Sequence, residues 1–222
     1  MFFFPIALII FIVYFILLLP VLFLLGYFHI VTLGFAKLGI SQEATIFILF
    51  LILIGSVINI PITKKKLFYK SESRFFGLWQ VPKLETHYTA INLGGAIIPA
   101  LLSFYFLFLL WQKGFELKPV FIATVLMIII SKFLAKIIPG RGVVLPTFIP
   151  PFFSAIFSLI LAPNFAAPVS FISGVLGTLI GADILNLRRI QKLSPGLISI
   201  GGAGVFDGIF LVGIISALLS GF

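Results

Sequence analysis

Long apolar runs separated by short basic segments constrain this chain more than any other feature of its sequence. The first run, residues 2–27, contains no acidic or basic side chain. A helix needs about 20 such residues to cross the hydrocarbon core of a bilayer, and by this rule the sequence predicts about seven membrane-spanning helices. Their expected ranges are 2–27, 44–62, 88–111, 120–138, 145–162, 168–187 and 196–222.

The amino-acid composition supports this interpretation. Hydrophobic residues make up 61% of the chain and charged residues only 9%, whereas about a quarter of the residues are charged in an ordinary soluble domain. We therefore expect an all-α fold, in which residues 1–222 form one integral membrane domain that crosses the cell membrane several times. Prolines and glycines at 92–99 and 146–151 indicate that some of the helices in this bundle are broken.

The net charge of +9 indicates anionic lipid headgroups as the partner, and not nucleic acid, because the cations lie in the connections between apolar runs. If seven helices alternate in direction, all but three of the 15 lysines and arginines fall on one side of the membrane. The exceptions are Lys37, Lys113 and Lys118. Since lysine and arginine favour the cytoplasmic side, this distribution predicts a cytoplasmic N-terminus and an external C-terminus.

Few residues in the sequence are typical ligands of a metal or a cofactor. The chain has no cysteine, and its two histidines, His29 and His87, lie in different connections. This excludes a disulfide framework, a thiolate nucleophile and a cysteine-based metal site. We expect no cofactor and no metal.

Three short segments carry local predictions. Residues 29–40 are mixed in polarity and predict an interfacial helix or a short connector. Ser41 is expected to cap the N-terminus of the next helix. The polar segment 67–86 mixes basic and aromatic residues, so we expect it at the level of the lipid headgroups.

Five motifs follow one another along the chain, at residues 59–61, 92–99, 149–151, 173–183 and 199–210. In their order and in their amino-acid residues, these motifs resemble the prokaryotic membrane family called domain of unknown function 1614. The resemblance covers most of the chain from the second predicted helix onward. It implies a membrane protein and no particular reaction.

The last two motifs also resemble, more distantly, the intramembrane aspartyl proteases of the presenilin, signal peptide peptidase and prepilin peptidase type. That resemblance implies that Asp183 and Asp207, on the last two predicted helices, jointly activate water. The motif differs in one respect, because Val205 and Phe206 separate Gly204 from Asp207. The residues expected to support the two acids or to lie beside a substrate are Gly201, Gly202, Gly204, Gly208, Asn186, Asn92 and Asn59.

The two aspartates lie within apolar runs, where a charged side chain costs several kcal/mol and is by default a functional-site hypothesis. If the last helix began at Gly196, Asp207 would lie about 10 Å deeper than Asp183. A glycine-rich, non-helical segment 194–203, followed by a helix from near Gly204, would bring the two acids to the same depth. Helix dipoles would then favour an ionised Asp207 at a helix start and a protonated Asp183 at a helix end.

Three functions stay open from the residues alone. In the first, spans in 1–163 form a scaffold, and residues 164–222 form a two-aspartate hairpin that hydrolyses a transmembrane peptide. The second is a proton- or cation-coupled transporter, which acids at helix ends and broken helices also suit. The third is a structural or assembly subunit, in which the buried acids only fix packing. The residues Ser170, Ser173, Gly174, Gly177 and Gly181 predict a close-packing seam on the sixth helix.

Overall fold

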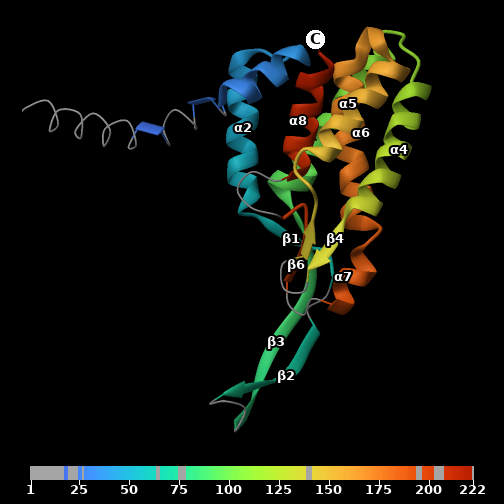
Figure 1. The fold of residues 1–222 in the computed structure, drawn as a ribbon. Helices are drawn as coiled ribbons and strands as arrows, with labels where there is room; N and C mark the ends of the chain where they lie inside the picture. The colour runs from blue at the N-terminus through green and yellow to red at the C-terminus, as the bar shows by residue number, and fades with distance from the viewer. Residues whose placement is uncertain are drawn as a thin grey trace, which may run out of the picture.

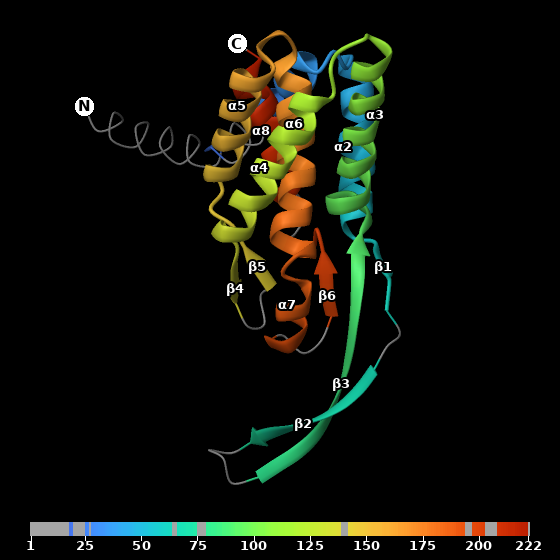
Figure 2. The ribbon, with the colours of Figure 1, turned by 90° about the vertical axis from the view of Figure 1, so that its right-hand side faces the viewer.

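The computed structural model describes residues 18–19, 25–26, 28–63, 66–74, 79–138, 142–193, 197–202 and 208–221. Helices lie side by side in a bundle, and strands extend from one end of it (Figures 1 and 2). The main helices of the bundle are α2 (Gln42–Ser56), α3 (Ile98–Gln112), α4 (Lys118–Leu134), α5 (Ile149–Leu161), α6 (Ala166–Thr178) and α8 (Gly208–Ser220).

Two helical stretches in the described part of the chain are long and apolar enough to cross a membrane. They are Leu93–Gln112 and Pro163–Gln191. A third crossing would result if the helix Phe28–Lys37 and α2, which are separated by a bend of 119°, form one broken span. The structure therefore supports a membrane protein with two or three such helices among the described residues.

The seven predicted spans are not confirmed. Helices α5 and α8 are apolar, but each has 13 residues in the described part of the chain, about 20 Å of helix against a hydrocarbon core of about 30 Å. The first predicted span, 2–27, lies almost entirely outside the described residues.

The fold is mostly helical, as predicted, but it is not all-α, because the chain also forms a four-stranded sheet. Its strands are β1 (Asn59–Pro61), β2 (Lys66–Arg74), β3 (Trp79–Asn92) and β6 (Leu197–Ile200). The central strand β3 pairs antiparallel with β1 and β2, and parallel with β6. A separate two-stranded sheet joins β4 (Lys136–Ile138) to β5 (Gly142–Val144).

The polar segment 67–86 lies in the long hairpin of β2 and β3. The register runs from Lys66 opposite His87 to Arg74 opposite Trp79. Aromatic and β-branched residues recur through this stretch, and such residues favour the extended backbone of a strand. The composition of the segment indicates its polarity, but by itself it does not predict the two strands.

Several local predictions can be compared with the structure. Ser41 does cap α2, since its side-chain oxygen accepts a hydrogen bond from the Ala44 N–H at 3.3 Å. Residues 145–148 are not helical, and Pro150 and Pro151 lie in the first turn of α5, where proline is tolerated. The predicted break after Asn92 is a π-helical turn, η1 (Leu93–Ile97), that leads into α3.

Helix α6 lies in the middle of the bundle and contacts α3, α4, α5 and α8. A methyl group added at Gly177 would overlap the Met127 side chain, and one added at Gly181 would overlap the Ile128 carbonyl oxygen, both on α4. On another side, Ser170 hydrogen-bonds Ser220 of α8 at 2.6 Å between hydroxyl oxygens. These small residues let α6 approach its neighbours closely.

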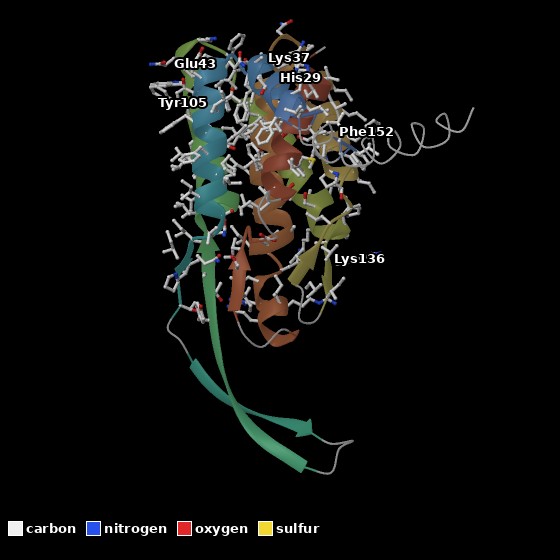
Figure 3. All side chains as sticks on the ribbon, turned by 90° about the vertical axis from the view of Figure 1, so that its left-hand side faces the viewer. His29, Lys37, Glu43, Tyr105, Lys136 and Phe152 are labelled. Atoms are coloured by element: carbon white, nitrogen blue, oxygen red, sulfur yellow. The ribbon has the colours of Figure 1, made fainter. Side chains whose placement is uncertain are left out.

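Different segments of the chain form the two ends of the bundle. Lys37, His29 and Glu43 lie at the end away from β3, and Lys136 lies toward the strands (Figure 3). Helix α6 connects the two ends. It continues through a π-helical segment, η3 (Leu179–Ile184), to the short helix α7 (Leu187–Leu193) beside the sheet.

Candidate functional site

Asp183 lies in η3, at the end of the bundle that meets the sheet. Its Oδ2 atom accepts a hydrogen bond of 2.8 Å from the backbone N–H of Gly201. Gly201 follows β6 directly, so the bond joins the sixth predicted helix to the strand that precedes α8. π-Helical segments are uncommon and are frequent at functional sites.

Two asparagines and a serine from three strands meet beside this turn. The Asn59 Oδ1 atom accepts hydrogen bonds from Asn92 Nδ2 at 3.2 Å and from Ser199 Oγ at 2.5 Å. The strand register places these residues close together, since Asn59 pairs with Asn92 and Ser199 pairs with Ala90. The sheet therefore connects motifs that lie about 140 residues apart in the chain.

Asn92 is buried, and it uses both ends of its amide. Its Nδ2 atom also donates to the Ser56 carbonyl at 2.7 Å, at the end of α2. Its Oδ1 atom accepts from the Gly95 N–H at 2.8 Å and so caps η1. Each such bond contributes about 1 kcal/mol, and loss of a partner leaves a buried polar group unpaired. The hydrogen bonds of the Asn92 side chain thus link α2, β1 and η1.

The glycines at this junction are required by close backbone approach. Gly201 has φ +69°, a left-handed conformation, and an added Cβ would lie 2.6 Å from the Ala96 Cβ. An added Cβ at Gly94 would overlap the Ile52 carbonyl oxygen of α2. The turn at Gly201 therefore packs directly against η1. This packing determines the position of the Gly201 N–H, which binds Asp183.

The remaining predicted site residues lie in different places. Asn186 is buried in the turn after η3, and among the described residues its Nδ2 atom donates to the carbonyls of Gly181 and Ala182, at 3.2 and 3.0 Å. Gly202 is exposed and lies against Ser199, and Gly208 is the first residue of α8. Asp207 and Gly204 lie outside the described residues.

Sequence reasoning did not select three residues that extend this polar junction. Gln191 Nε2 on α7 donates to Thr89 Oγ1 on β3 at 3.0 Å. The Thr89 N–H in turn donates to the Thr63 hydroxyl at 2.8 Å. A threonine in a strand and a glutamine in a basic connector carry no distinctive sequence signal, so only the tertiary structure identifies them.

The chemistry available here is that of a carboxylate held by a backbone donor. The Gly201 N–H occupies Oδ2 of Asp183, and Oδ1 accepts no hydrogen bond from the described residues. Among those residues, no group of three or more His, Cys, Asp or Glu is placed to hold a metal ion. A carboxylate in this position can take part in acid, base or proton-binding chemistry.

A family model described as "Protein of unknown function (DUF1614)" matches residues 53–219. The chain belongs to this family. The matched region contains the whole sheet, Asp183 and Asp207. No curated protein and no solved structure matches the chain. The resemblance to the presenilin-type proteases gains no support from these comparisons.

Proposed function

We propose that this DUF1614 protein is an intramembrane aspartyl hydrolase that uses Asp183 and Asp207. The hydrogen bond from Gly201 to Asp183 carries the proposal. Gly201 and Gly202 come directly before residues 203–207, and Asp207 is followed at once by α8. Asp183 thus accepts a hydrogen bond from a residue six positions before Asp207 in the chain.

The backbone around the bond supports this assignment. Residues 197–200 form a strand and Gly201 forms a turn, so the approach to Asp207 is not a helix from Gly196. Asp183 and Asp207 can lie at the same depth in the membrane if the segment before the last helix is not helical. The strand and turn at 197–202 support this arrangement.

In the proposed reaction the two carboxyl groups divide the acid and base roles. The ionised Asp207 takes a proton from a water molecule, whose oxygen attacks the carbonyl carbon of a peptide bond. Asp183, protonated on Oδ1, gives its proton to the carbonyl oxygen, forming a gem-diol. Asp207 then protonates the leaving nitrogen, Asp183 takes a proton from the gem-diol, and the C–N bond breaks. The net reaction consumes one water per peptide bond.

The test is cleavage of transmembrane peptides by the purified full-length chain in liposomes. We expect cleavage by the unmodified protein and a loss of at least a hundredfold in both Asp183→Asn and Asp207→Asn, because each acid supplies a proton transfer. Glu116→Gln, at an exposed acid of the connection between α3 and α4, is the matched control and should cleave normally. Cleavage that survives in the double Asp→Asn variant rejects the proposal.

A second candidate, proton or cation transport, is favoured by a different observation. The Ser131 hydroxyl on α4 and the Thr178 hydroxyl on α6 are buried and have no hydrogen-bond partner in the described part of the chain. Unpaired buried hydroxyls are costly, and water often satisfies such groups. Along α6, Thr178 lies between the serine contacts at 170–173 and Asp183.

Transport predicts an ion flux that hydrolysis does not. Liposomes loaded with a pH-sensitive dye would show proton entry with the unmodified protein, and a slower entry with Thr178→Val, which keeps the side-chain shape but removes the hydroxyl. Under the hydrolase proposal, Thr178→Val cleaves peptides at the normal rate and no flux is measured. The two measurements on the same preparation therefore separate the two functions.

A further inference from the structure

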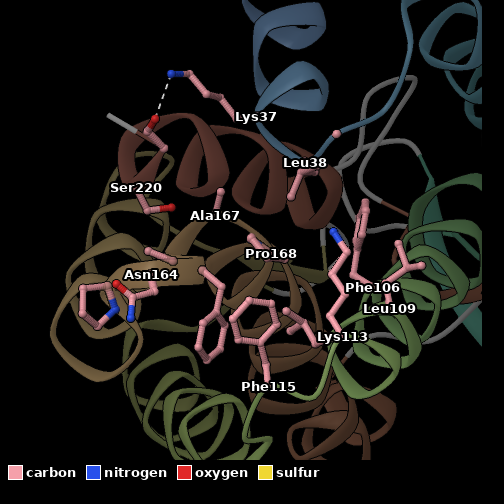
Figure 4. Close-up of a pocket in the computed structure, with 16 residues that line it drawn as sticks. Lys37, Leu38, Phe106, Leu109, Lys113, Phe115, Asn164, Ala167, Pro168 and Ser220 are labelled. Atoms are coloured by element: carbon pink, nitrogen blue, oxygen red, sulfur yellow. Dashed lines mark hydrogen bonds between the residues drawn. The ribbon is translucent and has the colours of Figure 1, made fainter.

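The end of the bundle away from the sheet contains a cavity of about 450 Å³ (Figure 4). Four segments form it: the end of the helix Phe28–Lys37, the end of α3, the turn that starts α6, and the end of α8. It lies at the opposite end of α6 from Asp183 and shares no residue with the candidate functional site.

Apolar side chains and polar groups both line this cavity. Phe106 is fully buried, and Phe115 stacks against Phe165 with ring centroids 4.5 Å apart. Lys37 and Lys113 line the same cavity from different helices (Figure 4). The described lining residues include no aspartate or glutamate. A ligand that fits this chemistry has a negative charge beside an apolar part.

The start of α6 contributes to the same preference. Helix α6 begins at Ala166 without a side-chain cap, and Ala166 and Ala167 line the cavity. The first turn of a helix carries unpaired N–H groups and the positive end of its dipole, which favour an anion. This feature adds to the two lysines and does not stand alone.

The position of the cavity at the ends of the candidate membrane helices favours a lipid over a dissolved anion as its ligand. One of the two candidate membrane helices, Leu93–Gln112, ends one residue before Lys113, and the other begins at Pro163, which also lines the cavity. Both therefore leave the hydrocarbon at this level, where phospholipid headgroups lie. Trp111, 64% exposed, lies beside Lys113, as is typical of residues at a membrane interface.

We infer that this cavity binds the anionic headgroup of a phospholipid, with the phosphate beside Lys113 and the start of α6. Of the three cations predicted on the external side, Lys37 and Lys113 line the cavity and Lys118 does not. The acyl chains would leave along α3, where Phe108 is 49% exposed and faces outward with Trp111. The inference concerns a lipid partner and is independent of the proposed hydrolysis.

The experiment is native mass spectrometry of the full-length protein released from detergent micelles that contain phosphatidylglycerol or phosphatidylcholine with the same acyl chains. We expect the unmodified protein to retain phosphatidylglycerol preferentially. Lys113→Gln should weaken this binding about fivefold, because one lysine near a lipid surface contributes about that factor. Lys113→Arg keeps the charge and should restore the binding.

Lys118→Gln is the matched control, since Lys118 is an exposed lysine at the same end of the bundle and does not line the cavity. Lys37 already donates a hydrogen bond of 2.8 Å to the Gly221 carbonyl, so the substitutions at Lys113 decide the result. Equal retention of the two lipids, or equal loss in Lys118→Gln, overturns the inference. Displacement of phosphatidylglycerol by glycerol phosphate at equal concentration would show a small-anion site and would also overturn it.

Discussion

At the scale of single residues, Gly201 couples the backbone to the candidate chemistry. Its N–H holds Asp183, its φ of +69° suits glycine, and its Cα faces Gly95 and Ala96 with no room for a side chain. Asn92 and Asn59 support the same turn through the sheet. The position of the Asp183 carboxylate therefore depends on residues that do not touch it.

We predict that Gly201→Ala lowers the free energy of unfolding by about 3 kcal/mol or more. The left-handed backbone accounts for about 1–2 kcal/mol, and displacement of Ala96 accounts for the rest. Gly114→Ala is the control, since Gly114 has φ +75° and no atom within 4 Å of an added Cβ. It should cost only about 1–2 kcal/mol. Denaturant unfolding in detergent measures both, and equal costs would show that the approach to Ala96 is not close.

At the scale of elements, α6 is stabilised by small residues on several sides. Gly177 and Gly181 contact α4, while Ser170 and Ser173 hydrogen-bond to α8 and α5. Membrane helices gain little from apolar burial against one another, so close backbone contact and hydroxyl bonds hold them together. The seam keeps α6 aligned between the two ends of the bundle.

Gly177→Ala should weaken this alignment, because the added methyl overlaps Met127 on α4. Overpacking of this kind costs about 1–3 kcal/mol, measured as a lower free energy of unfolding in detergent. The matched change is Gly26→Ala, in a helical turn where nothing lies within 4 Å of an added Cβ. There alanine should be neutral or stabilising by up to about 1 kcal/mol. A neutral Gly177→Ala would mean that α4 and α6 are not in close contact.

At the scale of the whole molecule, the bundle separates two chemistries. The strands and Asp183 lie at one end, and the cationic cavity lies at the other (Figures 1 and 4). The predicted orientation puts the first end in the cytoplasm and the second outside. The absence of cysteine makes this orientation directly testable with single-cysteine variants.

Glu116→Cys and Arg189→Cys place a thiol at exposed positions on opposite ends of the bundle. With an impermeant maleimide added to intact cells, we expect Glu116→Cys to label and Arg189→Cys to label only after the membrane is opened. The cysteine-free protein gives the background. The reverse pattern would invert the predicted orientation, and labelling of both in intact cells would contradict a membrane between them.

The sequence by itself determined the properties that depend on composition and short motifs. Apolar runs indicated a membrane protein, Ser41 was recognised as a helix cap, and Asp183 was singled out because carboxylates are costly in apolar surroundings. The motifs also identified the family. Each of these follows from residue type and local spacing, which do not require knowledge of the fold.

Only the tertiary structure decided which segments become strands and which motifs meet. The pairing of β1, β3 and β6 brings Asn59, Asn92 and Ser199 together, and the left-handed turn at Gly201 meets Asp183 across 18 residues of chain. Long-range strand pairing depends on partners far away in the sequence, so no local pattern reveals it. The same reason explains the cavity at the other end, whose two lysines come from helices that only the packing of the bundle brings side by side.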